Sequence, residues 1–344
     1  MKPSSDPVSA PIRVAVFGVS THFAYWGFHL VREIVGIVTG ETLHVHVTSL
    51  QTLQERLGER DDASVVVTSD FPDADLMEFL LPSPYPLIVF ADSNDEFAEW
   101  TAYSRKISLQ NAVRFCSNIV CVLTPAFLTR RALVLDPQIR TPNLVEAIVA
   151  HLFSSADEGL ALSVYETLAR EGRLPLDGPP DWRLSASFAE IEVAPVDLGR
   201  AAEMKSALAS YASVFARTFP AEIVWPVAMF TCPDSERGRA PIELTGPARI
   251  IMYGPYLHLP AGQWTARVEF EIDGAESGVE AATDVLISEV LVEKLFVMPR
   301  KGIFAYELAF SVSDPRRAVE IRLSTRRSAI EGRLLVRSVV VRAI

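Results

Sequence analysis

Residues 263–272 read Gln263-Trp-Thr-Ala-Arg-Val-Glu-Phe-Glu-Ile272, and apolar and polar residues alternate strictly along them. Successive side chains of a strand point to opposite faces, so this period of two predicts a strand with one buried face and one solvated face. The apolar face carries Trp264, Ala266, Val268, Phe270 and Ile272.

The same alternation recurs through the C-terminal part of the chain. Short strands about ten residues apart, with turn residues between them, are typical of a two-sheet β-sandwich, and we expect a jelly roll over residues 223–344. The expected strands are 223–231, 242–244, 248–253, 263–272, 283–293, 303–312, 319–324 and 333–342.

Residues 12–153 alternate instead between short apolar runs and segments of helical period. Strands that are apolar on both faces and separated by helices predict a parallel sheet covered on both sides, a doubly wound α/β domain of the Rossmann or flavodoxin kind. The expected strands are 12–17, 43–47, 63–68, 86–91 and 119–123, and the expected helices are 21–35, 50–57, 75–81, 97–115 and 143–153.

Residues 1–11 are expected to be a flexible tail, and residues 154–222 a connector with helices at 157–170 and 198–217 and a mixed segment at 182–193. Helix 198–217 has an apolar stripe at spacings of three and four. Two interpretations stay open: the stripe packs on its own chain, or it joins copies of the chain into a homo-oligomer. The stripe consists of Ala201, Met204, Leu208, Tyr211 and Phe215.

Composition limits the partners. A chain of 344 residues is long enough for two domains. Residues 241–344 hold 13 basic and 13 acidic residues, so the whole net charge of −11 falls on residues 1–240. This argues against nucleic acid and against an anionic membrane surface as partners.

Cysteine usage and the N-terminus favour a cytoplasmic protein. Cys116, Cys121 and Cys232 have apolar neighbours and no CxxC spacing, as expected of buried thiols in a reducing compartment. The first residues lack the apolar run of a signal peptide, and we expect no membrane helix of roughly 20 residues. Paired histidines occur at 22/29 and 44/46 without a third ligand, so we expect no metal site.

Two polar groups follow predicted strands of the α/β domain. Gly18, Ser20 and Thr21 lie where the first strand ends and a helix begins, which suits an anion or a nucleotide phosphate, although a hydroxyl there also serves as a helix cap. Asp92 and Asp95 follow the fourth strand, where carboxylates hold a divalent cation or a ribose, or again cap a helix.

The sandwich offers aromatic and basic residues for a glycan. Tyr253, Tyr256 and His258 lie around a Gly-Pro turn and combine flat apolar rings with polar edges, which suits stacking on sugars. Arg300 and Lys301 occupy a turn from which they reach carboxylated or sulfated groups. The tyrosines also suit a plain structural role in the turn.

The segment Tyr253-Gly-Pro-Tyr256, with Leu259-Pro260-Ala-Gly262-Gln-Trp264 after it, resembles carbohydrate-binding-type jelly-roll modules found beside glycosyltransferases in alphaproteobacteria. The resemblance covers roughly residues 240–344 and implies a glycan partner. Residues 1–240 resemble no family that we identify.

The leading hypothesis is a cytoplasmic protein of bacterial surface-polysaccharide production or its control, with the sandwich as a glycan-binding or assembly module. One alternative is a glycosyltransferase or other group transferase that uses a nucleotide-activated donor in the α/β crevice, with Mg²⁺ or Mn²⁺ as cofactor only in that case. Another is a non-catalytic scaffold that self-associates through helix 198–217.

Overall fold

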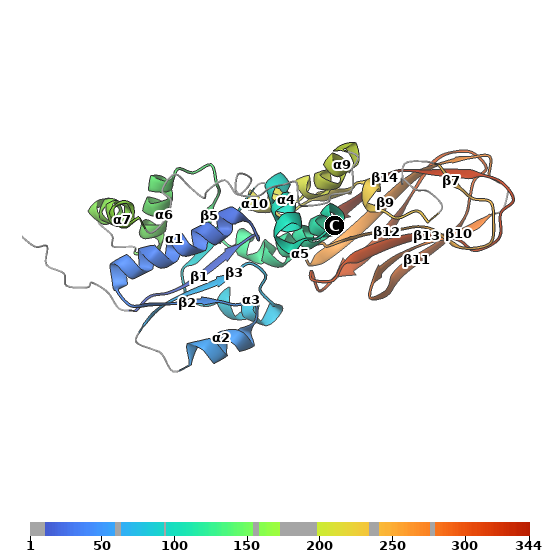
Figure 1. Cartoon of the computed structure of the whole chain (residues 1–344). Helices are drawn as coiled ribbons and strands as arrows, with labels where there is room; N and C mark the ends of the chain where they lie inside the picture. Colours follow the sequence, from blue (N-terminus) through green and yellow to red (C-terminus); the bar gives the residue numbers. More distant parts are fainter. Residues whose placement is uncertain are drawn as a thin grey trace, which may run out of the picture. The chain divides into compact units, whose positions relative to one another are not determined.

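The chain divides into two compact units, shown in the computed structural model of Figure 1. The first comprises residues 1–104 and 122–192, and the second comprises residues 105–121 and 193–344. The structure describes residues 11–58, 63–92, 94–153, 158–172, 198–233, 241–275 and 279–344. The mixed segment expected at 182–193 and most of the expected tail lie outside these residues.

The first unit is built on a five-stranded parallel sheet with the order β2-β3-β1-β4-β5, which confirms the predicted parallel sheet with helices. β1 lies in the middle, between β3 and β4, and β2 and β5 form the two edges. The strands are β1 (Arg13–Gly18), β2 (Thr42–His46), β3 (Ser64–Ser69), β4 (Leu87–Phe90) and β5 (Ala132–Leu135).

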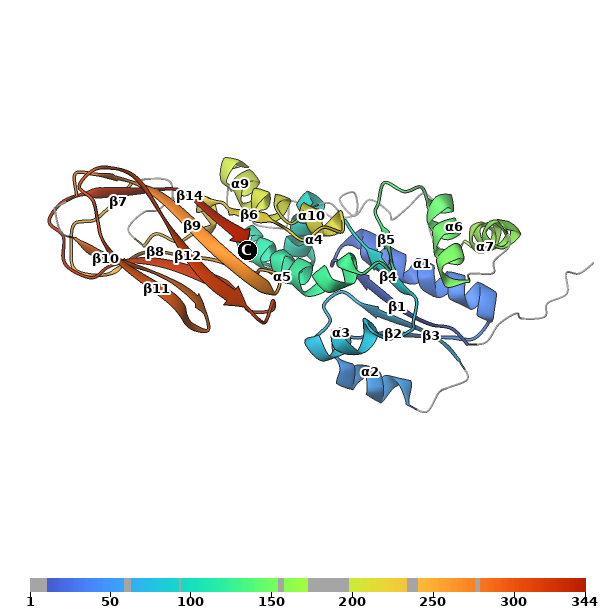
Figure 2. The same ribbon diagram turned by 180° about the vertical axis from the view of Figure 1, so that it is seen from behind.

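Helices lie on both faces of this sheet, as the front and back views show (Figures 1 and 2). α1, α6 and α7 share one apolar core with Val14, Val16 and Val66 of the strands, and α2 and α3 flank the other face. The helices are α1 (His22–Thr39), α2 (Leu50–Leu57), α3 (Ala74–Leu80), α4 (Asn94–Arg105), α5 (Leu109–Leu128), α6 (Thr141–Leu152) and α7 (Glu158–Glu171).

The strand predicted at 119–123 is wrong. These residues belong to α5, and the fifth strand is β5. A buried helix is as continuously apolar as a buried strand, so the run Ile119-Val-Cys-Val-Leu123 does not distinguish the two. The length of the apolar segment distinguishes them, because burial continues to Ala126 and Phe127, three and four residues after Leu123 and seven and eight after Ile119.

Among the described helices, α5 is long and apolar enough to cross a membrane by length and composition, contrary to the expectation from the sequence. Its apolar window is 67% buried within the protein, as in the core helix of a folded domain. Its residues up to Cys121 belong to the second unit.

The second unit contains two antiparallel sheets. One has the order β11-β10-β13-β8, and the other has the order β12-β9-β14-β6 with β7 paired to β14. The strands are β6 (Glu222–Trp225), β7 (Ile242–Glu243), β8 (Ile250–Leu257), β9 (Gly262–Asp273), β10 (Glu280–Ile287), β11 (Glu289–Val297), β12 (Gly302–Val312), β13 (Val319–Thr325) and β14 (Arg333–Ala343).

The alternation in β9 works as predicted, because its apolar face is fully buried: Trp264, Ala266, Val268 and Ile272 have no exposed surface. Across the core, the ring of Phe270 lies 5.9 Å from that of Phe296 in the other sheet. The antiparallel sheets are therefore confirmed, while the jelly-roll connection pattern stays a prediction.

Two expected strands are divided. The strand predicted at 283–293 is the hairpin of β10 and β11, which turns at Ser288 with a left-handed φ of 66°. No glycine or proline marks this turn, so the sequence reads as one continuous strand. The strand predicted at 223–231 is β6 followed by the 3₁₀ turn η2 (Val227–Met229), and Pro226 separates them.

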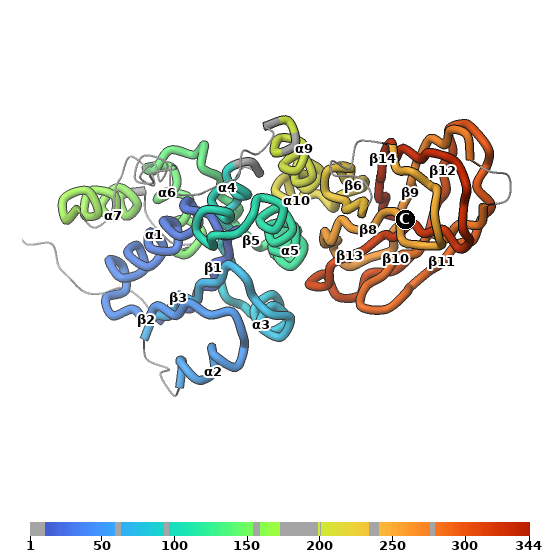
Figure 3. Tube along the Cα trace, turned by 45° about the vertical axis from the view of Figure 1, so that its right-hand side comes forward, coloured from blue at the N-terminus to red at the C-terminus, as the bar shows by residue number. Residues whose placement is uncertain are grey.

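Helix 198–217 is two helices, α9 (Leu198–Ala209) and α10 (Ala212–Phe215), which lie beside β6 in Figure 3. Leu208 and Tyr211 are completely buried, and α9 contacts β6 and η2. These members of the stripe pack on their own chain, while a homo-oligomer formed through this helix stays a prediction, because Ala201 and Phe215 are only partly buried.

Candidate functional site

Three polar residues stand at the carboxyl ends of neighbouring central strands in the first unit. Ser20 follows β1, Asp70 follows β3 and Asp92 follows β4, and all three are buried. Parallel strands end at one edge of the sheet, where ligands of open α/β folds bind. Of the predicted residues, this edge holds Gly18, Ser20, Thr21 and Asp92.

Asp70 is the centre of a hydrogen-bonded cluster at this edge. Its carboxylate accepts from the Ser20 hydroxyl at 2.7 Å and from the Tyr25 hydroxyl at 2.6 Å, and His46 Nε2 lies 3.5 Å away. Burial alone raises the pKa of this carboxyl, but the bonds from His46, Tyr25 and Ser20 outweigh burial and lower the pKa to about 2.

This cluster joins strand ends rather than activating a nucleophile. A carboxylate with a pKa of about 2 is a weak base, so it does not draw a proton from the Ser20 hydroxyl near neutral pH. Thr21 caps α1, because its hydroxyl accepts from the Ala24 amide at 3.2 Å. Asp95 lies in α4, and its side chain is outside the described structure.

In the second unit, the predicted tyrosines lie on the outer face of the sheet β11-β10-β13-β8. Tyr253 is paired with Arg322 of β13, so the two side chains share this face. The Tyr256 hydroxyl of β8 donates to Glu320 Oε1 of β13 at 3.0 Å. The rings of Tyr253 and Tyr256 meet edge to face with centroids 6.4 Å apart.

Tyr256 is held from several sides. The Arg114 guanidinium lies 4.9 Å from the centroid of its ring, while Arg114 Nε donates to the Pro255 carbonyl at 2.9 Å. Burial and the bond to Glu320 raise the pKa of Tyr256 to about 12, so the phenol stays neutral. A fixed, half-buried aromatic ring is the surface on which a sugar stacks.

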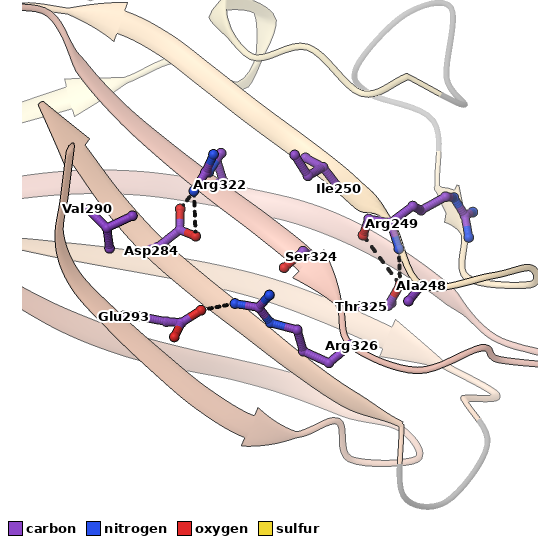
Figure 4. Close-up of a pocket in the computed structure, with 10 residues that line it drawn as sticks. All are labelled: Ala248, Arg249, Ile250, Asp284, Val290, Glu293, Arg322, Ser324, Thr325 and Arg326. Atoms are coloured by element: carbon purple, nitrogen blue, oxygen red, sulfur yellow. Dashed lines mark hydrogen bonds and ion pairs between the residues drawn. The ribbon is translucent and has the colours of Figure 1, made fainter. Parts of the chain in front are cut away.

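A depression of about 650 Å³ continues along this face, and Figure 4 shows the side chains that line it. Asp284 is its polar centre: it lies opposite Arg322 in one neighbouring strand and opposite Glu293 in the other. Arg322 binds Asp284 with two bonds, Nε to Oδ1 at 2.8 Å and Nη2 to Oδ2 at 3.0 Å. Arg326 pairs with Glu293.

A second depression of about 320 Å³ adjoins Tyr256 and Glu320. Glu320, Arg322 and Ser324 alternate along β13, so they point to one face and connect the two depressions. We name this face, lined by Tyr253, Tyr256, Asp284, Glu320, Arg322 and Ser324, the β13 groove.

The other predicted glycan residues lie elsewhere. His258 is buried, and it contacts the Ser117 hydroxyl through its backbone amide and its ring Nδ1, both at 3.2 Å. Arg300 and Lys301 lie in the β11–β12 turn, at the end of β10 that begins with Glu280, whereas Tyr256 lies near the opposite end at Leu286. Lys301 pairs with Asp273 at 3.0 Å.

The residues predicted from the sequence do not include Arg114, Asp284, Glu320 and Arg322. A signal exists for the last two, because Glu320 and Arg322 are the polar positions of the alternating strand 319–324. Asp284 lies in a strand whose burial is continuous, and Arg114 lies 141 residues from its partner Pro255. No local pattern reveals contacts of that kind.

No protein-family profile matches the chain. No curated protein matches it. Among solved structures, it is similar to the module TmCBM61 in complex with beta-1,4-galactotriose, at 14% identity over 36% of this chain and 83% of that one, with a TM-score of 0.24.

The chain is also similar to the C-terminal CBM6 of a laminarinase from Zobellia galactanivorans, at 14% identity over 29% of this chain and 75% of that one, with a TM-score of 0.21. A two-domain esterase active on acetylated mannans shares 10% identity over 96% of this chain and 90% of its own, with a TM-score of 0.24. TM-scores of this size carry no argument about function.

Proposed function

We propose that this protein binds a glycan in the β13 groove. The observation that carries the proposal is one continuous face that combines half-buried tyrosine rings with the two-bond pair of Arg322 and Asp284. Aromatic rings stack on the C–H faces of sugars, and paired charged groups bond to hydroxyls.

The opposite face of the sandwich has a different character. There the charged side chains of the β12-β9-β14-β6 sheet are exposed and pair with one another, as in Arg337–Glu271 and Arg342–Glu222. Exposed pairs of this kind are ordinary solvated surface. The Arg326–Glu293 pair of the groove is exposed to a similar degree, but the Asp284 side chain of the Arg322–Asp284 pair is only 8% exposed, and this difference supports the β13 groove as the binding face.

The length of the groove favours an extended oligosaccharide. From Glu320 to Ser324 the backbone of β13 advances roughly 13 Å at about 3.3 Å per residue. Several sugar units in a row therefore fit along the strand, with one over Tyr256 and another at Asp284. A role in bacterial surface-polysaccharide production and a cytoplasmic location are part of this proposal, and they rest on the sequence resemblance and composition.

The test is a glycan array probed with the full chain, followed by calorimetry on the best ligands. Arg322→Ala and Tyr256→Ala should each weaken binding at least tenfold, because each removes a contact that the sugar needs. Arg337→Ala, on the opposite face, is the matched control and should bind like the wild type. An array and calorimetry that both show no binding contradict the proposal.

A further inference from the structure

We propose that the β13 groove selects uncharged glycans and rejects uronic-acid and sulfated ones. The inference rests on the proposed glycan-binding function and names the substrate class of that site. The selectivity for uncharged glycans follows from the arrangement of the charged side chains in the groove.

Three arginines other than Arg249 line the two depressions of the groove, and each already lies beside a carboxylate. Arg322 binds both oxygens of Asp284, Arg326 pairs with Glu293, and Arg317 Nε lies 3.5 Å from Asp314 Oδ2. The Asp284 side chain is 8% exposed, so water screens this pair only weakly. An incoming carboxylate or sulfate would come close to the Asp284 carboxylate, whose negative charge already balances the guanidinium of Arg322.

Arg249 does not change this balance. The Arg249 guanidinium donates to the backbone carbonyls of Glu243, Leu244 and Pro247, at 2.7, 3.4 and 3.3 Å. Figure 4 shows it turned away from the groove, to which Arg249 contributes its backbone next to Thr325. At the other end, the negative charge of Glu320 and the positive charge of Arg114 both lie beside Tyr256.

A neutral sugar, unlike an anionic one, can hydrogen-bond to both members of the Arg322–Asp284 pair. A hydroxyl both donates and accepts, and a guanidinium has five N–H donors, of which the pair with Asp284 uses two. The ion pair of Arg322 and Asp284 thus presents N–H donors and carboxylate lone pairs side by side, and it stays intact when a hydroxyl binds. Adjacent hydroxyls of a sugar ring match that arrangement, and Ile250 and Val290 provide apolar contact beside it.

The experiment compares sugars that differ only at C6. The full chain is titrated by calorimetry with a β-1,4-glucan oligosaccharide and a β-1,4-glucuronan oligosaccharide of equal length, and likewise with any other neutral oligosaccharide that binds and its C6-oxidised form. The neutral member of any pair that binds should bind at least tenfold more tightly. Its Kd should change less than twofold between 50 and 500 mM NaCl, because no net ion pair forms.

Asp284→Asn should change the affinities for the neutral oligosaccharide and for the uronate in opposite directions, which misfolding cannot do. It keeps the shape of the side chain but frees the charge of Arg322, so affinity for the neutral oligosaccharide should fall and affinity for the uronate should rise. Glu271→Gln removes the carboxylate that pairs with Arg337 on the opposite face and is the matched control, with both affinities unchanged.

The outcomes separate the two proposals. Tighter binding of a uronate than of its neutral partner by the wild-type chain, or a loss of affinity of tenfold or more in salt, overturns the selectivity while the glycan-binding function stands. Binding of no oligosaccharide overturns both.

Discussion

Tyr256 is constrained both in its backbone conformation and in its side-chain contacts. It adopts a left-handed φ of 62°, which side chains other than glycine seldom do. Arg114, Tyr253 and Glu320 surround its ring and hydroxyl. Such a conformation persists where neighbouring contacts over-determine it, and residues of this kind gather at binding sites.

The contributions of the Tyr256 ring and of its hydroxyl to oligosaccharide affinity can be measured separately. Tyr256→Phe keeps the stacking surface and loses only the bond to Glu320, so we expect a two- to fivefold loss of oligosaccharide affinity, against the larger loss for Tyr256→Ala. Calorimetry on the full chain measures both. Equal losses in the two variants would mean that the hydroxyl, not the ring, makes the contact.

His258 predicts an acid-sensitive second unit. Burial lowers the pKa of the His258 imidazole from 6.5 to about 4, and the negative charge of Asp314 opposes this shift only in part. The folded protein therefore takes up this proton at a lower pH than the unfolded chain does. Stability is therefore complete above pH 6.5 and declines as the pH falls toward 4, by at most about 3 kcal/mol.

The check is thermal unfolding of the wild type and of His258→Asn between pH 7 and 4. The variant should lose less stability on acidification. Some dependence should remain from His44, whose pKa burial also lowers to about 4 and which lies in the first unit. Parallel pH curves for the two proteins would show that His258 is not the titrating group.

At the scale of elements, α1 depends on a close approach to the sheet. Gly27 lies against the Phe90 ring of β4, and a Cβ at this position would overlap the ring. Gly36 of the same helix has open space, with Thr42 Oγ1 the nearest atom at 3.8 Å. Two glycines in one helix thus have different physical roles.

Gly27→Ala should destabilise the first unit by about 1–3 kcal/mol, because Phe90 is fully buried and cannot move aside. Gly36→Ala is the matched control and should be neutral or stabilise by up to about 1 kcal/mol, since alanine favours a helix interior. Urea unfolding followed by circular dichroism measures both. Equal effects would contradict the proposed packing difference.

Asp70 ties three elements together, because its carboxylate at the end of β3 bonds to Ser20 after β1 and to Tyr25 of α1 and lies beside His46 at the end of β2. Asp70→Asn should cost about 1–3 kcal/mol, since the bonds to a charged acceptor are lost. The exposed Asp75 of α3 is the control, and Asp75→Asn should stay within about 0.5 kcal/mol.

The pH profile tests the same residue independently. The pKa of Asp70 is about 2 in the folded chain and about 3.9 in an unfolded one, so its contribution is complete above pH 4 and disappears as the pH falls toward 2. The wild type should lose more stability than Asp70→Asn across this range. An equal loss would show that the carboxylate is not held as the structure describes.

At the scale of the whole molecule, the second unit is discontinuous in sequence. Residues 105–121, from the first half of the chain, bring Arg114 to Tyr256 and Ser117 to His258. β6 pairs with β14, and its Trp225 is buried. A fragment of residues 241–344 lacks all of these contacts.

We therefore expect the isolated fragment 241–344 to lack a cooperative thermal transition, although its strands are present, because the β6 edge and the α5 support are missing. The comparison is a calorimetric scan of the fragment beside one of the full chain. A fragment that melts cooperatively, and binds the same oligosaccharide with equal affinity, would show that the added segments are dispensable.

The sequence alone determined the classes of structure, because hydrophobic periodicity is local: period two identified the antiparallel strands, and apolar runs between helical segments identified the parallel sheet. It also placed Tyr253 and Tyr256 among the candidate residues. Where local patterns are ambiguous it erred, as in the continuous apolar run of α5 and the unmarked turn at Ser288.

Only the tertiary structure decided what the candidates touch. It buried His258, put Lys301 at the far end of the sandwich, and brought Asp284, Glu320 and Arg322 onto the face of the tyrosines. The reason is that strand register and helix docking join residues far apart in the chain: Arg322 meets Asp284 across 38 residues, and Arg114 meets Pro255 across 141.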